Sequence, residues 1–318
     1  MSQPLVSIVI ATRERPELLQ RAIQSILRQS LQEIEIIVVD DGSSQPVLES
    51  YSEAAANADP RVSYHSAVKA PHPVRGACQA RNYGLSLVQS PYYVFFDDDD
   101  EMVVEDHLET ALRFYREYPG SVYFADIRMV NDGRVVLEGR LREYDKPMLS
   151  EQISANPPVY RVSHQQFAAV VAHRWPHPNA AVYETAVARS LGGLTDGLQP
   201  AEDLNFCLRY ADRASCVIYR RESVAIFDVT PRPRLFAAFS DIHRDLIGGL
   251  TVSHALASIS NKHLLRAAAR IHAHFLSVAA EKLNKSGSKT AARHFARLSL
   301  AIRISGNGVR QFVRSLLQ

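Results

Sequence analysis

Short apolar runs alternate with stretches of helical periodicity over the first half of the chain. The runs are too short for helices and contain many β-branched and aromatic residues, so they predict buried strands. The predicted strands are residues 5–11, 34–39, 61–65, 92–96 and 122–130, the last followed by an Asn-Asp-Gly hairpin turn and a strand at 135–138. The predicted helices are residues 16–30, 46–56, 77–88 and 104–118. This alternation indicates an α/β fold with a mixed, mostly parallel central sheet covered on both faces.

The pattern becomes irregular over residues 140–174, and the composition changes after about Pro233. The last part of the chain is rich in Ala, Leu and Arg. Its apolar periodicity predicts amphipathic helices at 264–283 and 290–304, with a break near Gly287. We therefore predict an α/β domain over residues 1–232 and a C-terminal α-helical region over residues 233–318.

A dense acidic cluster stands at the end of the fourth predicted strand, where the apolar run leads directly into Asp97-Asp98-Asp99-Asp100-Glu101. In open α/β sheets, ligands bind at the carboxyl edge, where this cluster falls. Adjacent carboxylates repel one another. A divalent cation with a preference for oxygen ligands, such as Mg²⁺, Mn²⁺ or Ca²⁺, would remove this repulsion. The alternative is a solvated acidic loop that caps the next helix. We favour the metal site.

Composition and cysteine content argue against several classes of protein. The 318 residues are 46% hydrophobic and 22% charged, which is ordinary for a globular chain with a sizeable core. The cysteines, Cys78, Cys207 and Cys216, form no close pair, which argues against a disulfide framework or a zinc site and fits a reducing compartment. Neither a G-x-G-x-x-G motif after the first strand nor a P-loop is present, so we do not expect a dinucleotide Rossmann site.

The first residues and the basic C-terminal region indicate where in the cell the protein is expected. The first four residues lack the basic start of a signal peptide, and no apolar stretch reaches the length of a membrane span, so we expect a cytoplasmic protein. The net charge is +2, but Glu281 is the only acid from Leu246 onward. The basic helices either pack on the rest of the protein or make peripheral contact with the inner face of an anionic membrane. We expect no nucleic-acid partner, because the basic residues are not interleaved with aromatic ones.

Five motifs stand in a fixed order, each at a strand end or a helix start. They are Val6 to Arg13, Ile36 to Ser43, Gly76 to Gly84, Val94 to Asp100, and Gly192-Gly193 followed by Glu202-Asp203. Together they resemble the motifs of the family 2 glycosyltransferases of the GT-A fold. The resemblance extends over about two thirds of the chain, residues 4–227. It implies an enzyme that takes a nucleotide-activated sugar, usually carried by UDP, and transfers the sugar to a hydroxyl acceptor.

The resemblance assigns donor binding to residues within or next to the first three motifs. The positions matching Thr12 and Glu14 hold the nucleoside, and the position matching Asp41 accepts a base N–H, commonly that of uracil. Read alone, Asp41 also fits a turn-forming residue after a strand. Arg75 and Arg81 stand where the family often places cations for the base or the diphosphate, and a surface salt bridge is the alternative for either.

The acidic cluster matches the D-x-D motif of the family. In the register Asp97-x-Asp99, the resemblance assigns donor contacts to Asp97 and Asp98. It assigns Mn²⁺ or Mg²⁺ to Asp97 and Asp99, and this cation neutralises charge on the departing diphosphate. The register Asp98-x-Asp100 fits the same motif. We prefer the first register, because Phe96 then supplies the apolar residue that precedes the motif.

Asp203 matches the general base of the family, in a Glu202-Asp203 pair that opens a helix. This base deprotonates the acceptor hydroxyl as the bond forms, and attack opposite the leaving group inverts the anomeric carbon. Alternatively, both acids only favour the helix dipole. His177, between two prolines, and Glu202 are candidates for the acceptor pocket. Many relatives carry a histidine after the last strand, near the position of Asp228 in this chain.

The sequence thus predicts an inverting, metal-dependent glycosyltransferase whose acceptor is a glycan or a lipid-linked saccharide. A sugar nucleotidyltransferase is one alternative, although the residues after the first strand, Thr12-Arg13-Glu14-Arg15, are not the Gly-rich, Lys-containing loop of that class. A non-catalytic module that binds a nucleotide sugar or a metal is the other. Such a module would be expected to have lost acidic residues that this chain retains.

Overall fold

The computed structural model describes residues 3–56, 59–67, 76–198, 201–230 and 241–302. The chain forms two compact units, and each unit combines segments that are distant in sequence. The first unit comprises Met1–Ser163, Pro176–Leu194 and Arg213–Pro231. The second comprises His164–Trp175, Thr195–Asp212 and Arg232–Gln318.

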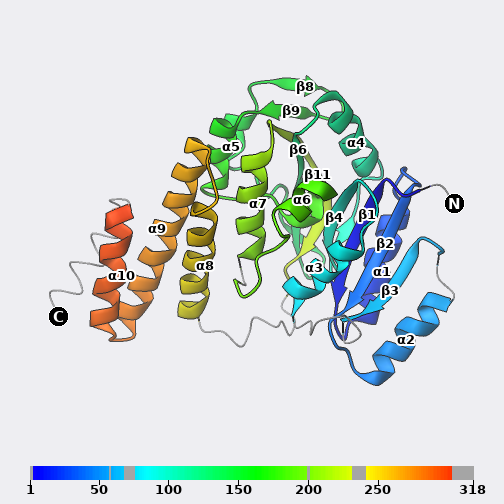
Figure 1. Cartoon of the computed structure of the whole chain (residues 1–318), viewed down its shortest axis with the longest axis horizontal. Coiled ribbons are helices and arrows are strands. Elements are labelled where there is room, and N and C mark those ends of the chain that lie inside the picture. The colour runs from blue at the N-terminus through cyan, green and yellow to red at the C-terminus, as the bar shows by residue number, and fades with distance from the viewer. Residues whose placement is uncertain (1–2, 57–58, 68–75, 199–200, 231–240, 303–318) are drawn as a thin grey trace. The chain divides into compact units, whose positions relative to one another are not determined.

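The first unit consists of a central sheet and the helices packed on it (Figure 1). Its strands are β1 (Val6–Thr12), β2 (Ile34–Asp40), β3 (Val62–Ser66), β4 (Tyr92–Asp97), β5 (Glu101–Met102), β6 (Val122–Asn131), β7 (Arg134–Leu137), β8 (Gln152–Ser154), β9 (Val159–Val162), β10 (Ala181–Glu184) and β11 (Val217–Asp228). Its helices are α1 (Pro16–Leu27), α2 (Gln45–Ala56), α3 (Ala77–Leu87), α4 (His107–Glu117) and α6 (Thr185–Ser190), with short 3-10 helices η2 (Lys146–Met148) and η3 (Pro178–Ala180). Among the described residues the sheet has 11 strands in the order β3-β2-β1-β4-β10-β6-β11-β9-β8, with β5 paired to β11 and β7 to β6.

The sheet is mixed, and its parallel part carries the predicted donor motifs. Strands β3, β2, β1 and β4 are mutually parallel, whereas β10 runs antiparallel to both β4 and β6. Thr12 at the end of β1 pairs with Asp40 at the end of β2, and Ala11 pairs with Asp97 at the end of β4. Parallel pairing therefore brings the carboxyl ends of these strands, and the acidic motifs that follow them, to one edge of the sheet.

Burial on both faces explains the uninterrupted apolar runs. Consecutive residues Ile8, Val9 and Ile10 of β1 are fully buried, and because successive side chains point to opposite faces, β1 is covered on both sides. Helix α3 packs on β1 and β2. Gly84 of α3 permits this approach, since a Cβ at that position would overlap the Val9 side chain and lie 3.2 Å from Val39 Cγ2. The predicted strands and the predicted α/β fold with a mixed central sheet are confirmed. The described sheet has four parallel and six antiparallel strand pairs, so it is not mostly parallel.

The predicted Asn-Asp-Gly turn joins β6 to β7. Asp132 and Gly133 have φ angles of 48° and 73°. Positive φ at both central residues is the conformation of a type I′ hairpin turn, for which Asp-Gly is a preferred pair. The predicted hairpin is confirmed.

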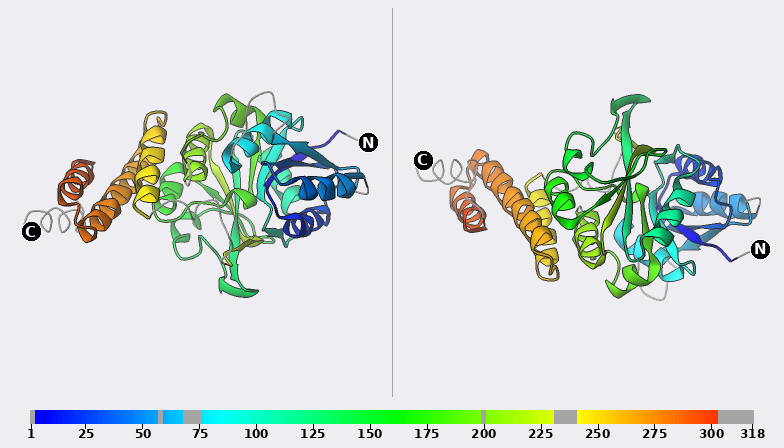
Figure 2. Two further views of the ribbon diagram at one scale, coloured as in Figure 1. Left: turned by 90° about the horizontal axis from the view of Figure 1, so that it is seen from below. Right: turned by 90° about the horizontal axis from the view of Figure 1, so that it is seen from above.

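The second unit is helical. Its helices are α5 (His164–Val171), α7 (Glu202–Arg213), α8 (Asp241–Leu256), α9 (Lys262–Lys285) and α10 (Lys289–Ile302). Helix α9, drawn in orange in Figure 2, packs against α8, α10 and α5. The predicted helices at 264–283 and 290–304 correspond to α9 and α10, and Gly287, with φ 83°, lies at the predicted break. Helix α8 was not predicted.

The two compact units do not coincide with the two regions predicted from sequence. The boundary at residue 232 follows the change in composition, whereas α5 and most of α7 belong spatially with the C-terminal helices. The division of the chain into an α/β domain over residues 1–232 and a helical region over residues 233–318 therefore stays a prediction. No helix in the described part of the chain is both long enough and apolar enough to cross a membrane.

Candidate active site

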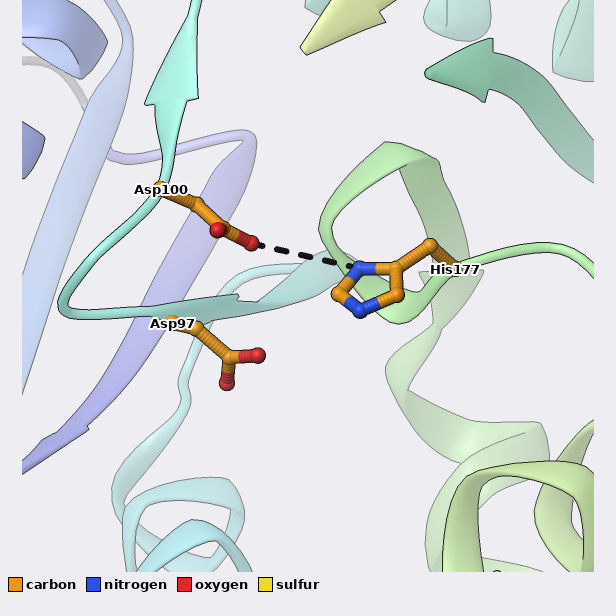
Figure 3. Close-up of side chains that lie close together, drawn as sticks. All are labelled: Asp97, Asp100 and His177. Atoms are coloured by element: carbon orange, nitrogen blue, oxygen red, sulfur yellow. Dashed lines mark ion pairs between the residues drawn. The ribbon is translucent and has the colours of Figure 1, made fainter. Parts of the chain in front are cut away.

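Two aspartates and one histidine meet at the carboxyl edge of the sheet (Figure 3). Asp97 is the last residue of β4, Asp100 ends the turn that follows, and His177 immediately precedes η3. Each offers a ligand atom, and these three atoms lie within 4.8 Å of one another. The Asp100 Oδ2 to His177 Nδ1 distance is 4.0 Å. Ligand atoms of a cation with bonds of about 2.1 Å lie about 3.0–4.2 Å apart, so small adjustments suffice for these side chains to hold one.

Asp100 is held rigidly in a buried position. Its side chain is fully buried, Oδ2 accepts a hydrogen bond from Asn179 Nδ2 at 2.6 Å, and Oδ1 accepts one from the Asp228 backbone N–H at 3.3 Å. Burial, together with the negative charges of Asp97 and Asp99, raises the pKa of Asp100 well above its ordinary value. An ionised Asp100 is therefore stable there only when a positive charge is close.

Arg81 supplies part of that positive charge. Its guanidinium forms a close ion pair with Asp97. Burial alone acts to raise the pKa of Asp97, but Arg81 and His177 outweigh it and hold this pKa below its ordinary value. His177 is fixed in turn, because its ring packs on Phe227 of β11 with the ring centroids 4.5 Å apart. The cluster thus combines an ionised carboxylate, a buried carboxylate and an imidazole.

Arg15 holds the other two aspartates. Its Nη1 lies 3.1 Å from Asp98 Oδ1 and 3.2 Å from Asp99 Oδ2. Asp98 Oδ2 also accepts a hydrogen bond from the Thr12 hydroxyl at 2.8 Å. Burial is the main cause that raises the pKa of Asp98 to about 6, with a further contribution from Asp99. Asp99, one of the two predicted metal ligands, therefore pairs with an arginine, whereas Asp97 and Asp100 group with His177.

Asp41 presents one buried oxygen at the same edge of the sheet. Its Oδ1 accepts a hydrogen bond from the Gly76 backbone N–H at 2.9 Å, and its Oδ2 is buried with no hydrogen-bond partner in the described part of the chain. Burial raises the pKa of Asp41. A buried acceptor without a donor is costly, so Oδ2 is suited to receive the N–H of a ligand.

A cavity of about 430 Å³ lies at the ends of β2 and β3. Asp40 and the aromatic residues Tyr51, Tyr64, His65 and Tyr83 contribute to its lining. The rings of Tyr51 and Tyr64 are stacked, with centroids 6.1 Å apart and an interplanar angle of 23°. A cavity with aromatic walls and a few polar groups suits a flat, polar ring.

The remaining predicted donor residues have different outcomes. Glu14 is exposed and has a positive φ of 57°, and its carboxylate accepts hydrogen bonds from the Ser44 backbone N–H and hydroxyl, so it holds the loop after β2. Thr12 is buried beside Asp98. The predicted Arg75 lies outside the described residues.

The predicted general base lies in the second unit, at the start of α7. Asp203 is partly exposed, and its Oδ2 accepts a hydrogen bond from Trp175 Nε1 at 2.8 Å. Its Oδ1 accepts one from the Leu204 backbone N–H at 2.7 Å. The neighbouring Glu202 is buried.

Most of these side chains are among the residues predicted from sequence, but the structure groups some of them differently. His177 is predicted for the acceptor pocket, whereas the structure brings this histidine to Asp100. Arg15, Asn179 and Trp175 are not among the predicted site residues. A signal existed for two of them, because Arg15 lies within the residues that follow the first strand and Trp175 is the single tryptophan of the chain.

Comparisons with known proteins agree with this fold. The family model described as glycosyl transferase family 2 matches residues 7–172. WcaA of Escherichia coli (strain K12), a glycosyl transferase named for colanic acid biosynthesis, is 41% identical over 102 residues, which cover 31% of this chain and 34% of WcaA. The PGL/p-HBAD biosynthesis glycosyltransferase of Mycobacterium bovis (strain BCG / Pasteur 1173P2) is 28% identical over 130 residues, which cover 41% of this chain and 49% of the relative. The matches thus span no more than half the length of these curated relatives.

Two solved structures share the fold over nearly the whole chain. The S. aureus TarS 1–349 complex with UDP-GlcNAc has a TM-score of 0.62 at 17% identity, covering 98% of this chain and 79% of that one. The mannosyltransferase PcManGT from Pyrobaculum calidifontis, in complex with GDP-Man and Mn²⁺, has a TM-score of 0.60 at 17% identity, covering 100% and 87%. At this identity the likeness concerns the fold, and it confirms the predicted GT-A architecture.

Proposed function

Because the chain belongs to glycosyl transferase family 2, we propose that it transfers a sugar from a nucleotide-sugar donor to a hydroxyl group of a glycan or lipid-linked saccharide, with inversion at the anomeric carbon. The observation that carries this proposal is the cluster of Asp97, Asp100 and His177 at the carboxyl ends of parallel strands. Acidic groups at this edge suit a cation and a diphosphate, and a dinucleotide fingerprint is absent from the sequence.

We propose that Asp97, Asp100 and His177 hold the divalent cation, as a revision of the pair Asp97 and Asp99 taken from sequence. Two carboxylates and one imidazole suit Mn²⁺ better than Mg²⁺, which prefers oxygen ligands throughout. The bound cation would neutralise charge on the leaving nucleoside diphosphate. Arg81 pairs with Asp97 and adds a further positive charge, which supports its predicted role beside the diphosphate.

The nucleoside is proposed to lie between Asp41 and the aromatic cavity. The buried Oδ2 of Asp41 would accept an N–H of the base, and the stacked rings of Tyr51 and Tyr64 offer a flat wall. One carboxylate oxygen suits the single N3–H of uracil, which supports a UDP-linked donor. Thr12 and Asp98, hydrogen-bonded to one another, are the proposed contacts to the ribose.

Proton transfer is proposed for Asp203. A hydroxyl acceptor is a weak nucleophile, and a positioned carboxylate that removes its proton as the new bond forms lowers the barrier. The leaving nucleoside diphosphate departs on the opposite side of the sugar, so the configuration inverts. The partial exposure of Asp203 leaves room for an acceptor, and Glu202 beside it is retained as a candidate acceptor contact.

A donor screen tests the proposed function. The unfolding temperature of the purified protein is measured with UDP-, GDP- or dTDP-sugars, with and without Mn²⁺, and release of the nucleoside diphosphate is measured in unheated samples of the same mixtures. We expect one class of nucleotide sugar to raise the unfolding temperature in the presence of Mn²⁺ and to be hydrolysed slowly. Stabilisation by none of them would overturn the proposal. Formation of a nucleoside triphosphate and a sugar 1-phosphate when pyrophosphate is added would indicate a nucleotidyltransferase instead.

A further inference from the structure

We infer that Trp175 positions the carboxylate of Asp203, so that it is a positioning residue of the transfer reaction; this inference rests on the proposed role of Asp203 as general base. The indole Nε1–H donates to Asp203 Oδ2 at 2.8 Å. Both residues belong to the second unit, where Trp175 follows α5 and Asp203 lies in the first turn of α7. Residues separated by 28 positions in the chain are thus joined by one direct hydrogen bond.

The two oxygens of Asp203 have donors of different kinds. Oδ1 accepts from the backbone N–H of Leu204, the next residue, and this local bond moves with α7. Within the described residues, the donor to Oδ2 that comes from outside α7 is the Trp175 indole. A carboxylate bonded at one oxygen can still rotate, whereas donors at both oxygens fix its plane. A base acts well only when its oxygen meets the acceptor hydroxyl at hydrogen-bond distance and in the correct orientation.

Indole is chemically suited to this task. Its Nε1–H donates and does not accept, so it pairs with the ionised carboxylate and does not compete for the proton of the acceptor. Each carboxylate oxygen has more than one lone pair, so Oδ2 can accept from Trp175 and still receive a proton from substrate. Pro176 restricts the backbone of the residue before it, which further limits the positions open to Trp175.

The hydrogen bond can be observed directly, because Trp175 is the only tryptophan of the 318 residues. A ¹⁵N-labelled sample of the full chain therefore gives one indole N–H resonance. We expect this resonance to lie downfield in the proton dimension, as for an N–H bonded to a carboxylate, and to move upfield in Asp203→Asn. Asp196→Asn, which changes an exposed acid of the same unit, serves as the matched control and should leave the resonance in place. A resonance unmoved by Asp203→Asn overturns the inference.

Two substitutions test the effect of Trp175 on turnover, because they distinguish its N–H donor from the packing of its aromatic ring. Trp175→Phe keeps an aromatic ring and removes the N–H, whereas Trp175→His places an imidazole Nε2–H at the same ring position as the indole N–H. With UDP-GlcNAc or GDP-mannose and Mn²⁺ as probes, we expect Trp175→Phe to lower kcat for nucleotide release about tenfold to a hundredfold, with the donor KM unchanged. Trp175→His should restore part of the loss.

The outcomes distinguish this inference from the proposed function. If Asp203→Asn keeps normal turnover, the assignment of the base fails, while the indole resonance still reports on the hydrogen bond. If Asp203→Asn abolishes turnover and Trp175→Phe keeps the kcat of the unsubstituted protein, the positioning role fails. Equal losses in folded Trp175→Phe and Trp175→His would assign the effect to ring packing and likewise overturn the inference.

Discussion

The substitution Asp126→Asn should stabilise this protein above pH 6. Asp126 lies on β6, its side chain is buried, and burial is the main cause that raises its pKa to about 6. The ordinary Asp value is 3.8, so the folded state holds a proton between these two pH values that the unfolded state has released. Stability contributed by this group is therefore complete below pH 3.8 and is lost as pH rises through about 6. Two pKa units correspond to about 3 kcal/mol, an upper bound on the gain from removing the charge.

The amide fits the contacts that the carboxylate makes. Oδ1 accepts from the backbone N–H groups of Ile127 and Leu141 at 2.9 and 3.0 Å, and the oxygen of an asparagine keeps both bonds. Oδ2 lies 3.4 Å from the Tyr219 hydroxyl, which also lies 3.3 Å from Asp145 Oδ2. An amide N–H at the Oδ2 position would donate to the Tyr219 oxygen while the hydroxyl proton goes to Asp145. The change also removes the ion pair between Oδ2 and Arg142 Nε, 4.0 Å apart, but the Arg142 side chain is 43% exposed, so water solvates its charge and the loss is small.

Urea denaturation at pH 8, 6 and 4, followed by far-UV circular dichroism, measures the effect. We expect Asp126→Asn to exceed the unsubstituted protein in unfolding free energy at pH 8, by less at pH 6, and to match it at pH 4. Glu138→Gln removes a carboxylate that is 59% exposed and should give no such pH dependence. A variant destabilised equally at all three pH values would show that the buried charge of Asp126 carries no cost.

Three further predictions concern the packing of α3 on β1, the ion pair of Arg81 with Asp97, and the basic C-terminal region. Ala usually stabilises a helix relative to Gly by about 1 kcal/mol. Gly84→Ala should nevertheless lower the unfolding free energy by about 1–3 kcal/mol, because the added Cβ would overlap the Val9 side chain. The double variant with Val9→Ala should recover most of this loss, and a stabilised single variant would contradict the packing of α3 on β1. Arg81→Gln removes the guanidinium that pairs with Asp97, so the unfolding temperature without metal should fall. The rise in unfolding temperature produced by Mn²⁺ alone should then be larger than in the unsubstituted protein. An equal rise in both proteins would argue against a cation at this cluster. The chain from Leu246 onward is basic, because Glu281 is its only acid. The protein should therefore co-sediment with vesicles that contain the anionic lipid phosphatidylglycerol, less so at high salt, and not with vesicles of pure phosphatidylcholine. Equal binding to both kinds of vesicle would exclude an electrostatic membrane contact.

The strands that position the site were predictable from sequence because they are buried on both faces. Such strands are continuous apolar runs, and parallel pairing fixes where their ends meet. The acidic residues after β2 and β4 could therefore be placed at one edge before their side-chain contacts were known. The register within the aspartate cluster could not be read, because it depends on how the turn after β4 directs each carboxylate and on the arginine that pairs with Asp98 and Asp99.

Other parts of the molecule depend on contacts between distant segments. The His177 side chain lies 4.0 Å from Asp100 although the two are far apart in sequence, and a lone histidine between prolines carries no local sign of such a partner. Helix α5 packs on α9, which no periodicity within either segment reveals. Helix α8 was missed because Gly248 and Gly249 weaken its helical pattern, and the first of them faces the Phe275 ring, where a Cβ would lie 2.6 Å from Cε1.

Calorimetry of UDP binding shows whether Asp97, Asp100 and His177 bind the cation on which we propose that donor binding depends. Titrations with and without Mn²⁺ are compared for the unsubstituted protein, Asp100→Asn and Asp99→Asn. We predict that UDP binds the unsubstituted protein much more tightly with Mn²⁺, that Asp100→Asn loses this difference, and that Asp99→Asn keeps most of it. Equal UDP affinity with and without Mn²⁺ in the unsubstituted protein would show that donor binding needs no cation. Loss of the difference in Asp99→Asn but not in Asp100→Asn would show that the cation is held by Asp99 and not by Asp100.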